Sequence, residues 1–189
     1  IAVRNPEGGF TCAYFGCDGP HRVVSTAGAR RWTLAPEFMY PIERGTRSGL
    51  VGPWETPDLG DIGAGVNPGG VDPWGISNFQ IFPNLEILVY AGWYILYRYW
   101  PTGPNTHRFE ATLGFHPART VRERIEHEVA SVVFKEFGLQ DAGTLGGTQR
   151  ALETGVVDRF PLNDQEILVR HFHHVVGEWV ADYEKERVG

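Results

Sequence analysis

The stretch ISNFQIFPNLEILVYAGWYILYRYWPTGPNTHRFEATLGF, residues 76–115, decides the fold class of this 189-residue chain. It contains four runs rich in Ile, Phe, Tyr, Trp and Val, and the sequences FPN, AG and PTGPN separate them. β-Branched and aromatic residues favour strands, whereas Pro, Gly and Asn favour the turns between strands. The stretch therefore predicts an antiparallel meander.

Side chains in the third run alternate between two faces of the predicted sheet. Because successive strand residues point to opposite sides, one face carries Trp93, Ile95, Tyr97 and Tyr99 and the other carries Tyr94, Leu96, Arg98 and Trp100. We expect one face to line a cavity or core and the other to lie under a covering element. An ordinary aromatic core explains the same pattern equally well.

The segments before and after the meander predict a hairpin and then helices. FTCAYFG and HRVVSTAG, with a turn between them, read as a hairpin. After the meander the apolar spacing becomes helical, and Thr120 with Glu123 forms a capping box. A first helix of about 17 residues is expected to end at Gly138. A shorter helical segment is expected to follow Asp141 and to stop near Gly155.

A long C-terminal helix is predicted after Asn163 and Glu166, which form a second capping pair. Its apolar stripe consists of Leu168, Phe172, Val175, Val176, Trp179 and Tyr183. At about 24 residues it would be roughly 36 Å long, enough to cross a sheet. Strands followed by helices describe an α+β domain of helix-grip (START/Bet v 1-like) type, with an antiparallel sheet packed around the long C-terminal helix.

Composition limits the domain count and the partners. A chain of 189 residues is expected to form a single domain spanning residues 1–189. The net charge of −6 and the dispersed Lys and Arg argue against nucleic acid. No apolar run reaches the length of a membrane span, and the first residues lack the pattern of a signal peptide. We therefore expect a soluble, cytoplasmic protein without a membrane or nucleic-acid partner.

Two groups of residues are weak candidates for metal binding: Cys12, Cys17 and His21, and on the C-terminal helix His171, His174 and Glu178. The first matches no zinc spacing, and two strand thiols with a surface histidine explain it better. The second lies at helical offsets of three and four, but it is opposite the apolar stripe, where a solvated surface is expected. No Ser/His/Asp or Cys/His signature of nucleophilic catalysis is visible.

Asp141 has two interpretations. Asp is a favoured N-cap, and on spacing alone a cap at the start of the shorter helical segment is the better explanation. The alternative is a metal ligand that faces a pocket.

The second interpretation gains from a family resemblance. The meander, the helix after it, GLQDAGTLGGTQRAL, and FPLNDQEILVRHFHHVVGEWV together resemble the catalytic domain of the large (alpha) subunit of Rieske-type non-haem iron aromatic-ring-hydroxylating oxygenases. The resemblance covers about residues 76–180. It implies that Asp141 is the carboxylate ligand of a mononuclear Fe(II), and that Phe134, Phe137 and, more loosely, Asn84 contact the substrate.

The resemblance also implies cofactors and partners. The iron is expected to have a 2-His-1-carboxylate site, and a [2Fe–2S] Rieske cluster is expected to supply its electrons. The expected partners are O₂ and an aromatic substrate, a ferredoxin or reductase as electron donor, and further subunits in a homotrimer or α3β3 oligomer.

Two motifs of the family are missing from this sequence. Neither the Cys-x-His/Cys-x-x-His cluster motif nor the paired iron histidines is present. We therefore expect the chain to be incomplete on its N-terminal side, lacking the Rieske domain and the iron-His helix, and to be inactive alone. A non-catalytic START-like module that binds an apolar small molecule remains the alternative.

Overall fold

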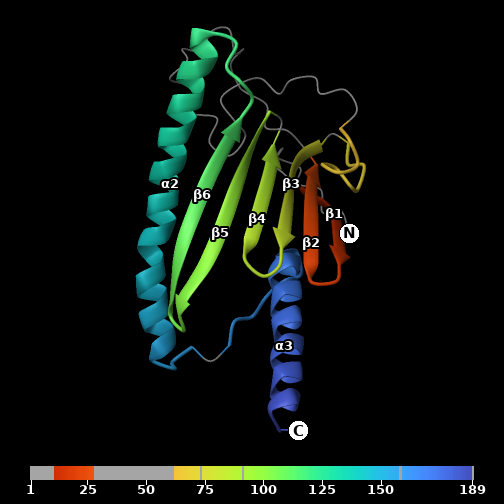
Figure 1. Ribbon diagram of the computed structural model, residues 1–189, viewed down its shortest axis with the longest axis vertical. Helices are drawn as coiled ribbons and strands as arrows, with labels where there is room; N and C mark the ends of the chain where they lie inside the picture. Colours follow the sequence, from red (N-terminus) through yellow and green to blue (C-terminus); the bar gives the residue numbers. More distant parts are fainter. Residues whose placement is uncertain (1–10, 28–61, 73, 91, 158, 189) are drawn as a thin grey trace.

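A single antiparallel sheet forms the centre of the computed structural model, which describes residues 11–27, 62–72, 74–90, 92–157 and 159–188. Its strand order is β1-β2-β3-β4-β5-β6, so each strand pairs with its neighbour in sequence (Figure 1). The strands are β1 (Thr11–Asp18), β2 (His21–Ala27), β3 (Trp74–Ile81), β4 (Leu85–Tyr90), β5 (Trp93–Gly103) and β6 (Thr106–Phe115). The predicted hairpin and meander are both confirmed.

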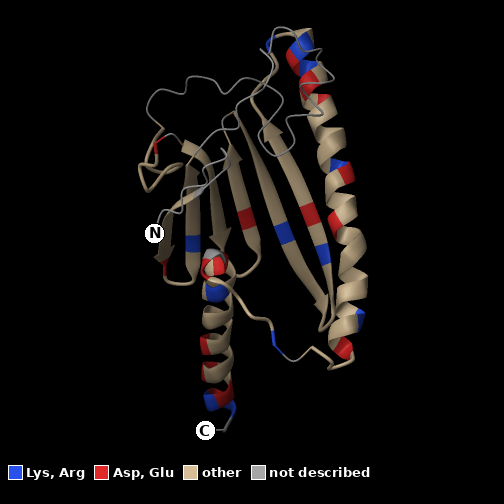
Figure 2. Ribbon diagram, turned by 180° about the vertical axis from the view of Figure 1, so that it is seen from behind, with Lys and Arg blue, Asp and Glu red and all other residues tan. Residues whose placement is uncertain are grey.

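Two helices follow the sheet, α2 (Val121–Glu153) and α3 (Ile167–Val188), with the short 3-10 turn η3 (Asp164–Glu166) directly before α3. The predicted α+β helix-grip fold is confirmed. Charged positions are sparse on the strands and recur along the helices (Figure 2), as expected where a sheet supplies the core and the helices meet solvent.

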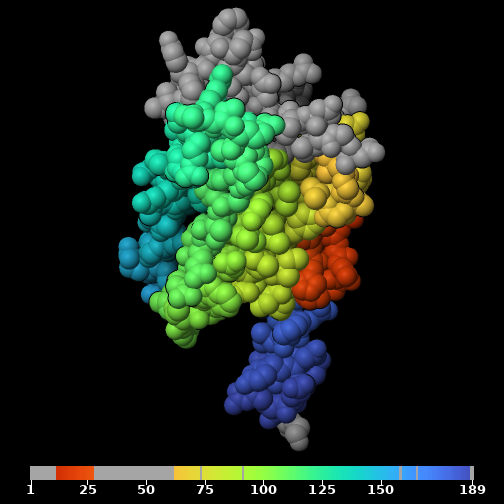
Figure 3. All heavy atoms as spheres, turned by 45° about the horizontal axis from the view of Figure 1, so that its top comes forward, coloured from red at the N-terminus to blue at the C-terminus, as the bar shows by residue number. Residues whose placement is uncertain are grey.

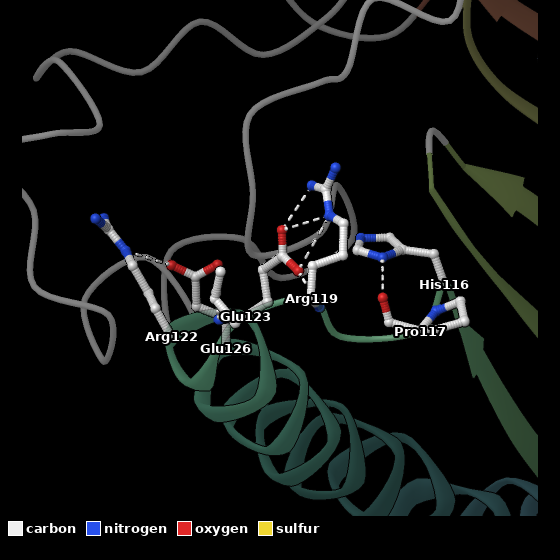
Figure 4. A network of polar contacts seen from close by, with 7 residues as sticks. His116, Pro117, Arg119, Arg122, Glu123 and Glu126 are labelled. Atoms are coloured by element: carbon white, nitrogen blue, oxygen red, sulfur yellow. Dashed lines mark hydrogen bonds and ion pairs between the residues drawn. The ribbon is translucent and has the colours of Figure 1, made fainter.

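The start of α2 follows the predicted capping pattern. Thr120 has an extended backbone, and its hydroxyl accepts a hydrogen bond from the backbone N–H of Glu123. The Glu123 carboxylate accepts from the backbone N–H and the guanidinium of Arg119 (Figure 4). These bonds, with the Arg119 side chain first, lower the pKa of Glu123 to about 2.

The prediction that the helix breaks at Gly138 is wrong. α2 is continuous for 33 residues, so Asp141 lies inside a helix and caps nothing. Gly138 is not among the glycines with positive φ, whereas Gly155, which follows the helix, has a φ of 69°. A helix-interior glycine costs only about 0.5–1 kcal/mol relative to alanine, and ring contacts between α2 and the sheet, described below, offset that cost.

The core lies on the face of the sheet that α2 covers. Ile95 is fully buried, and with Tyr90 and Trp93 it forms the centre of the cluster. Phe134 of α2 packs against this cluster. On the opposite face, Tyr94 and Trp100 are each 43% exposed. Within the described ranges, these two side chains are therefore not buried under the expected covering element.

The C-terminal helix contacts the sheet and the β3–β4 turn through its first half, as far as Trp179, whose ring lies 5.0 Å from that of Phe82. Val175 is buried, and the rings of Phe82 and Phe172 lie 6.0 Å apart. Further along, Tyr183 is 58% exposed. Figures 1 and 3 show α3 running beyond the end of the sheet. The predicted apolar stripe is thus buried or half-buried from Leu168 to Val176 and exposed at Trp179 and Tyr183.

Candidate functional site

A cavity of about 230 Å³ lies between α2 and strands β5 and β6, and we call it the Asp141 cavity. Its lining residues are Tyr97, Tyr99, His107 and Phe109 from the sheet and Phe134, Phe137, Gly138, Asp141, Ala142 and Leu145 from the helix. The helix residues recur at intervals of three and four, so one face of a continuous α2 presents them all. Three of the four expected site residues, Phe134, Phe137 and Asp141, therefore share one cavity.

Aromatic rings form most of the walls of this cavity. Tyr97 stacks on Phe134 with ring centroids 6.1 Å apart, and it packs against Phe109 at 5.2 Å. Tyr99 packs against Phe109 at 5.1 Å. Such walls suit a flat apolar ring, because offset and tilted aromatic contacts add to the burial of apolar area.

Asp141 is the carboxylate on these walls, and its side chain is exposed. Its negative charge acts on Tyr97: burial, the charge of Glu86 and the charge of Asp141 together raise the pKa of that phenol to about 12. Tyr97 therefore stays protonated at neutral pH and can donate a hydrogen bond.

Asn84, the fourth expected residue, lies in a neighbouring cavity of about 290 Å³, which we call the Arg22 cavity. Its lining residues are Arg22, Gln80, Ile81, Phe82, Pro83, Asn84, Leu85, Glu86, Tyr99 and Phe172. The backbone N–H of Tyr99 donates to the carbonyl of Asn84 at 3.0 Å. Tyr99 lines both cavities, so the two sites meet at this residue.

A carboxylate lies in the wall of the Arg22 cavity. Glu86 Oε1 accepts hydrogen bonds from Asn78 Nδ2 at 2.7 Å and from Gln80 Nε2 at 3.3 Å. Burial raises the pKa of Tyr99, and the charge of Glu86 and a hydrogen bond to its carboxylate raise it further. The Tyr99 phenol therefore stays protonated at neutral pH.

In the Asp141 cavity, most of the lining residues that the sequence did not predict as site residues lie on the hairpin of β5 and β6. Tyr99 pairs with Phe109, and Pro101 pairs with His107. The alternation along β5 had placed Tyr97 and Tyr99 on one face, but the register of the hairpin was needed to add Phe109 and His107. For Phe109 and His107, the sequence offered only the turn predicted at PTGPN, which places their strand beside β5 without giving the register.

No group of three His, Cys, Asp or Glu side chains that could hold a metal ion occurs in the part of the chain that the structure describes. The candidate group on the C-terminal helix does not form a metal site: His171 packs against the ring of Phe15 at 6.1 Å, whereas His174 forms a surface pair with Glu178 at 3.4 Å, as expected for a solvated face. Cys12 is an exposed free thiol. Asp141 shares its cavity with one imidazole, that of His107.

An antiparallel sheet and a helix line an aromatic cavity with one carboxylate in an α+β domain of helix-grip type. Among the described residues, no helix has the length and apolar character needed to cross a membrane. Residues 2–182 match the family described as ring hydroxylating alpha subunit (catalytic domain), and the chain belongs to that family. Neither a curated protein nor a solved structure matches the chain.

Membership of this family supports an oxidoreductase of the oxygenase class that depends on non-haem iron. It also implies, in general terms, a substrate, O₂ and electron-transfer partners.

Proposed function

We propose that this chain forms the substrate-binding wall and supplies the carboxylate iron ligand of a Rieske non-haem iron oxygenase that hydroxylates an aromatic or related apolar compound. One observation carries the proposal: Asp141 lies on the same cavity as Phe134 and Phe137. A carboxylate beside an apolar, ring-lined cavity suits a metal that reacts next to a bound ring.

The donor set fits part of the expected iron site. A facial triad needs two imidazoles and one carboxylate. Asp141 would supply the carboxylate, and the described residues of its cavity add the single imidazole of His107. When bound, Fe(II) would supply the activation of O₂, with electrons from a [2Fe–2S] cluster.

The residues of this chain bind and orient the substrate. Tyr97, stacked on Phe134 and tilted against Phe109, forms with them an aromatic wall that would hold a ring and exclude water from one side of it. The phenol of Tyr97, kept protonated, would offer a hydrogen-bond donor next to that ring. Phe137, which is 43% exposed, would lie at the open edge of the cavity.

The test is the Asp141→Ala variant of the complete oxygenase. We expect the mononuclear iron to be lost or weakened and turnover to fall at least about 100-fold, since losing even an outer-shell partner of a metal ligand costs about 10–100-fold. The Rieske absorption should remain. Glu136→Gln is the control, because this exposed carboxylate on the same helix does not line the cavity. Unchanged iron content and activity in Asp141→Ala would refute the assignment.

The alternative is a non-catalytic module that binds an apolar small molecule. The ring-lined cavity supports it independently, since a binder needs the walls and no metal. Iron analysis and a single-turnover assay of the complete protein separate the two functions: a binder holds the aromatic compound without stoichiometric iron and releases it unchanged. Mass photometry of the complete protein would test the proposed homotrimer or α3β3 assembly.

A further inference from the structure

Arg22 is a buried cation in the wall of the second cavity. It lies on β2, is only 8% exposed, and has its guanidinium over the ring of Phe172 at 5.0 Å. Its Nε and Nη1 atoms are buried and have no hydrogen-bond acceptor among the residues that the structure describes. Because an arginine side chain stays charged in proteins, this guanidinium has donors and a positive charge to satisfy.

Glu86 does not satisfy them. Its carboxylate already accepts hydrogen bonds from the side-chain amides of Asn78 and Gln80. Among the described residues, no ion pair within 4.0 Å joins it to Arg22. Burial lowers the pKa of Arg22, and the charge of Glu86 opposes that effect only in part. The two groups interact at a distance, which leaves the N–H groups of Arg22 available to another partner.

The same side of the sheet links this cation to the Asp141 cavity. Arg22 pairs with Gln80, Gln80 with Glu86, and Glu86 with Tyr97, so four residues form one row across β2 to β5. With strands about 4.8 Å apart, the row spans about 14 Å at the level of the backbone. The row is polar at Arg22 and aromatic at Tyr97, and Tyr99 lines the cavity at each end.

We propose that the Arg22 cavity binds the carboxylate of an aromatic acid, whose ring extends past Tyr99 towards the Asp141 cavity. A carboxylate gives charge-assisted hydrogen bonds to a guanidinium and compensates its charge, whereas a neutral carbonyl gives only the hydrogen bonds. Gln80 Oε1 is a buried acceptor that has no donor in the described part of the chain, and it offers a place for a hydroxyl beside the acid group. The proposal rests on the proposed function for the reaction at the ring, but not for binding of the acid.

Equilibrium binding to the complete oxygenase tests this without turnover. Calorimetric titration, without O₂ or an electron donor, would compare benzoate, cinnamate and biphenyl-4-carboxylate with their primary amides and methyl esters. We expect at least one acid to bind tenfold or more tightly than both of its neutral analogues. If no acid binds tenfold more tightly than both of its neutral analogues, the carboxylate assignment is overturned.

Variants at Arg22 give the second readout. Arg22→Gln and Arg22→Met should each remove the tenfold preference for the acid. The methionine variant should stay folded, because replacing a buried unpaired charge by an apolar side chain is often neutral or stabilising. Arg98→Gln is the control, since Arg98 pairs with Glu110 at 3.8 Å and is 40% exposed. A preference that survives in both Arg22 variants overturns the proposal.

The Asp141→Ala variant separates this result from the proposed function. Asp141 does not line the Arg22 cavity, so that variant should keep the preference for the acid even when it loses iron. If it keeps its iron while the Arg22 variants lose the preference, the iron assignment fails and the acid site stands. If Asp141→Ala loses its iron while the Arg22 variants keep the preference for the acid, the acid site is refuted and the iron assignment stands.

Discussion

Replacing Gly138 by alanine tests the continuity of α2, on which the Asp141 cavity depends. In a helix that ends at Gly138, the glycine would adopt a left-handed conformation, and alanine would destabilise the protein. In the continuous helix Gly138 has no positive φ, and a Cβ added there meets no atom within 4 Å. The broken and the continuous helix therefore predict opposite signs for the change in stability caused by Gly138→Ala.

We expect Gly138→Ala to stabilise the protein by about 0.5–1 kcal/mol, the helix-interior difference between alanine and glycine. For a chain of this size that corresponds to a rise of roughly 1–4 °C in the midpoint of thermal unfolding. Circular dichroism melts of wild type and variant under one buffer condition would measure it. Hydrogen exchange across residues 134–150 should show continuous protection.

Gly155→Ala is the matched control. Gly155 follows the same helix with a φ of 69°, a conformation that alanine adopts only with strain. We expect it to lower the midpoint where Gly138→Ala raises it. A lower midpoint for Gly138→Ala, or rapid exchange confined to the amides around it, would refute the continuous helix and with it the shared cavity of Phe134 and Asp141.

Two further predictions concern the walls of the Asp141 cavity. Phe134→Ala should destabilise the protein by about 1.5–2.5 kcal/mol, half of the usual Phe→Ala range, because Phe134 is half-buried. Phe137 is more exposed, so Phe137→Ala should destabilise the protein less in the same urea titration. The reverse order of the two variants would contradict the docking of α2. Tyr97 should lose its proton near pH 12 rather than 10. Since the folded state holds this proton more tightly, its contribution to stability is complete below pH 10 and is lost as the pH rises towards 12. Subtracting the tyrosinate absorbance of Tyr97→Phe from that of the wild type, at each pH, isolates the titration of Tyr97. A titration midpoint near pH 10 would contradict the burial of Tyr97.

The strands could be predicted from sequence because turn residues separate runs of β-branched and aromatic residues. Thr120 and Asn163 also marked the start of α2 and of the turn before α3, since a cap is a local hydrogen bond between residues close in sequence. Gly138 misled the prediction, because local propensity favours a stop there and tertiary contacts decide otherwise. Tyr97 and Phe134 supply such contacts, and they are 37 positions apart in the chain.

The two cavities differ in how far sequence could reveal them. Phe134, Phe137 and Asp141 follow one another at helical spacing, so a continuous helix would have placed them together without any knowledge of the sheet. Asn84 lies on a turn, and no local spacing joins it to that helix face. Its position in the Arg22 cavity follows from the pairing of β4 with β5, where its carbonyl accepts from Tyr99.

Arg22 shows that the class of ligand a cavity can bind depends more on the register of the strands than on the composition of the sequence. In sequence it is one basic residue at the start of HRVVSTAG, and nothing nearby distinguishes it from a solvated strand end. A register slip of one residue would move it to the opposite face. The observed pairing instead aligns Arg22 with Gln80 and Glu86 on the side where Tyr97 and Phe134 stack. An apolar substrate would leave the guanidinium unpaired, whereas an aromatic acid of matching length satisfies both ends of the row.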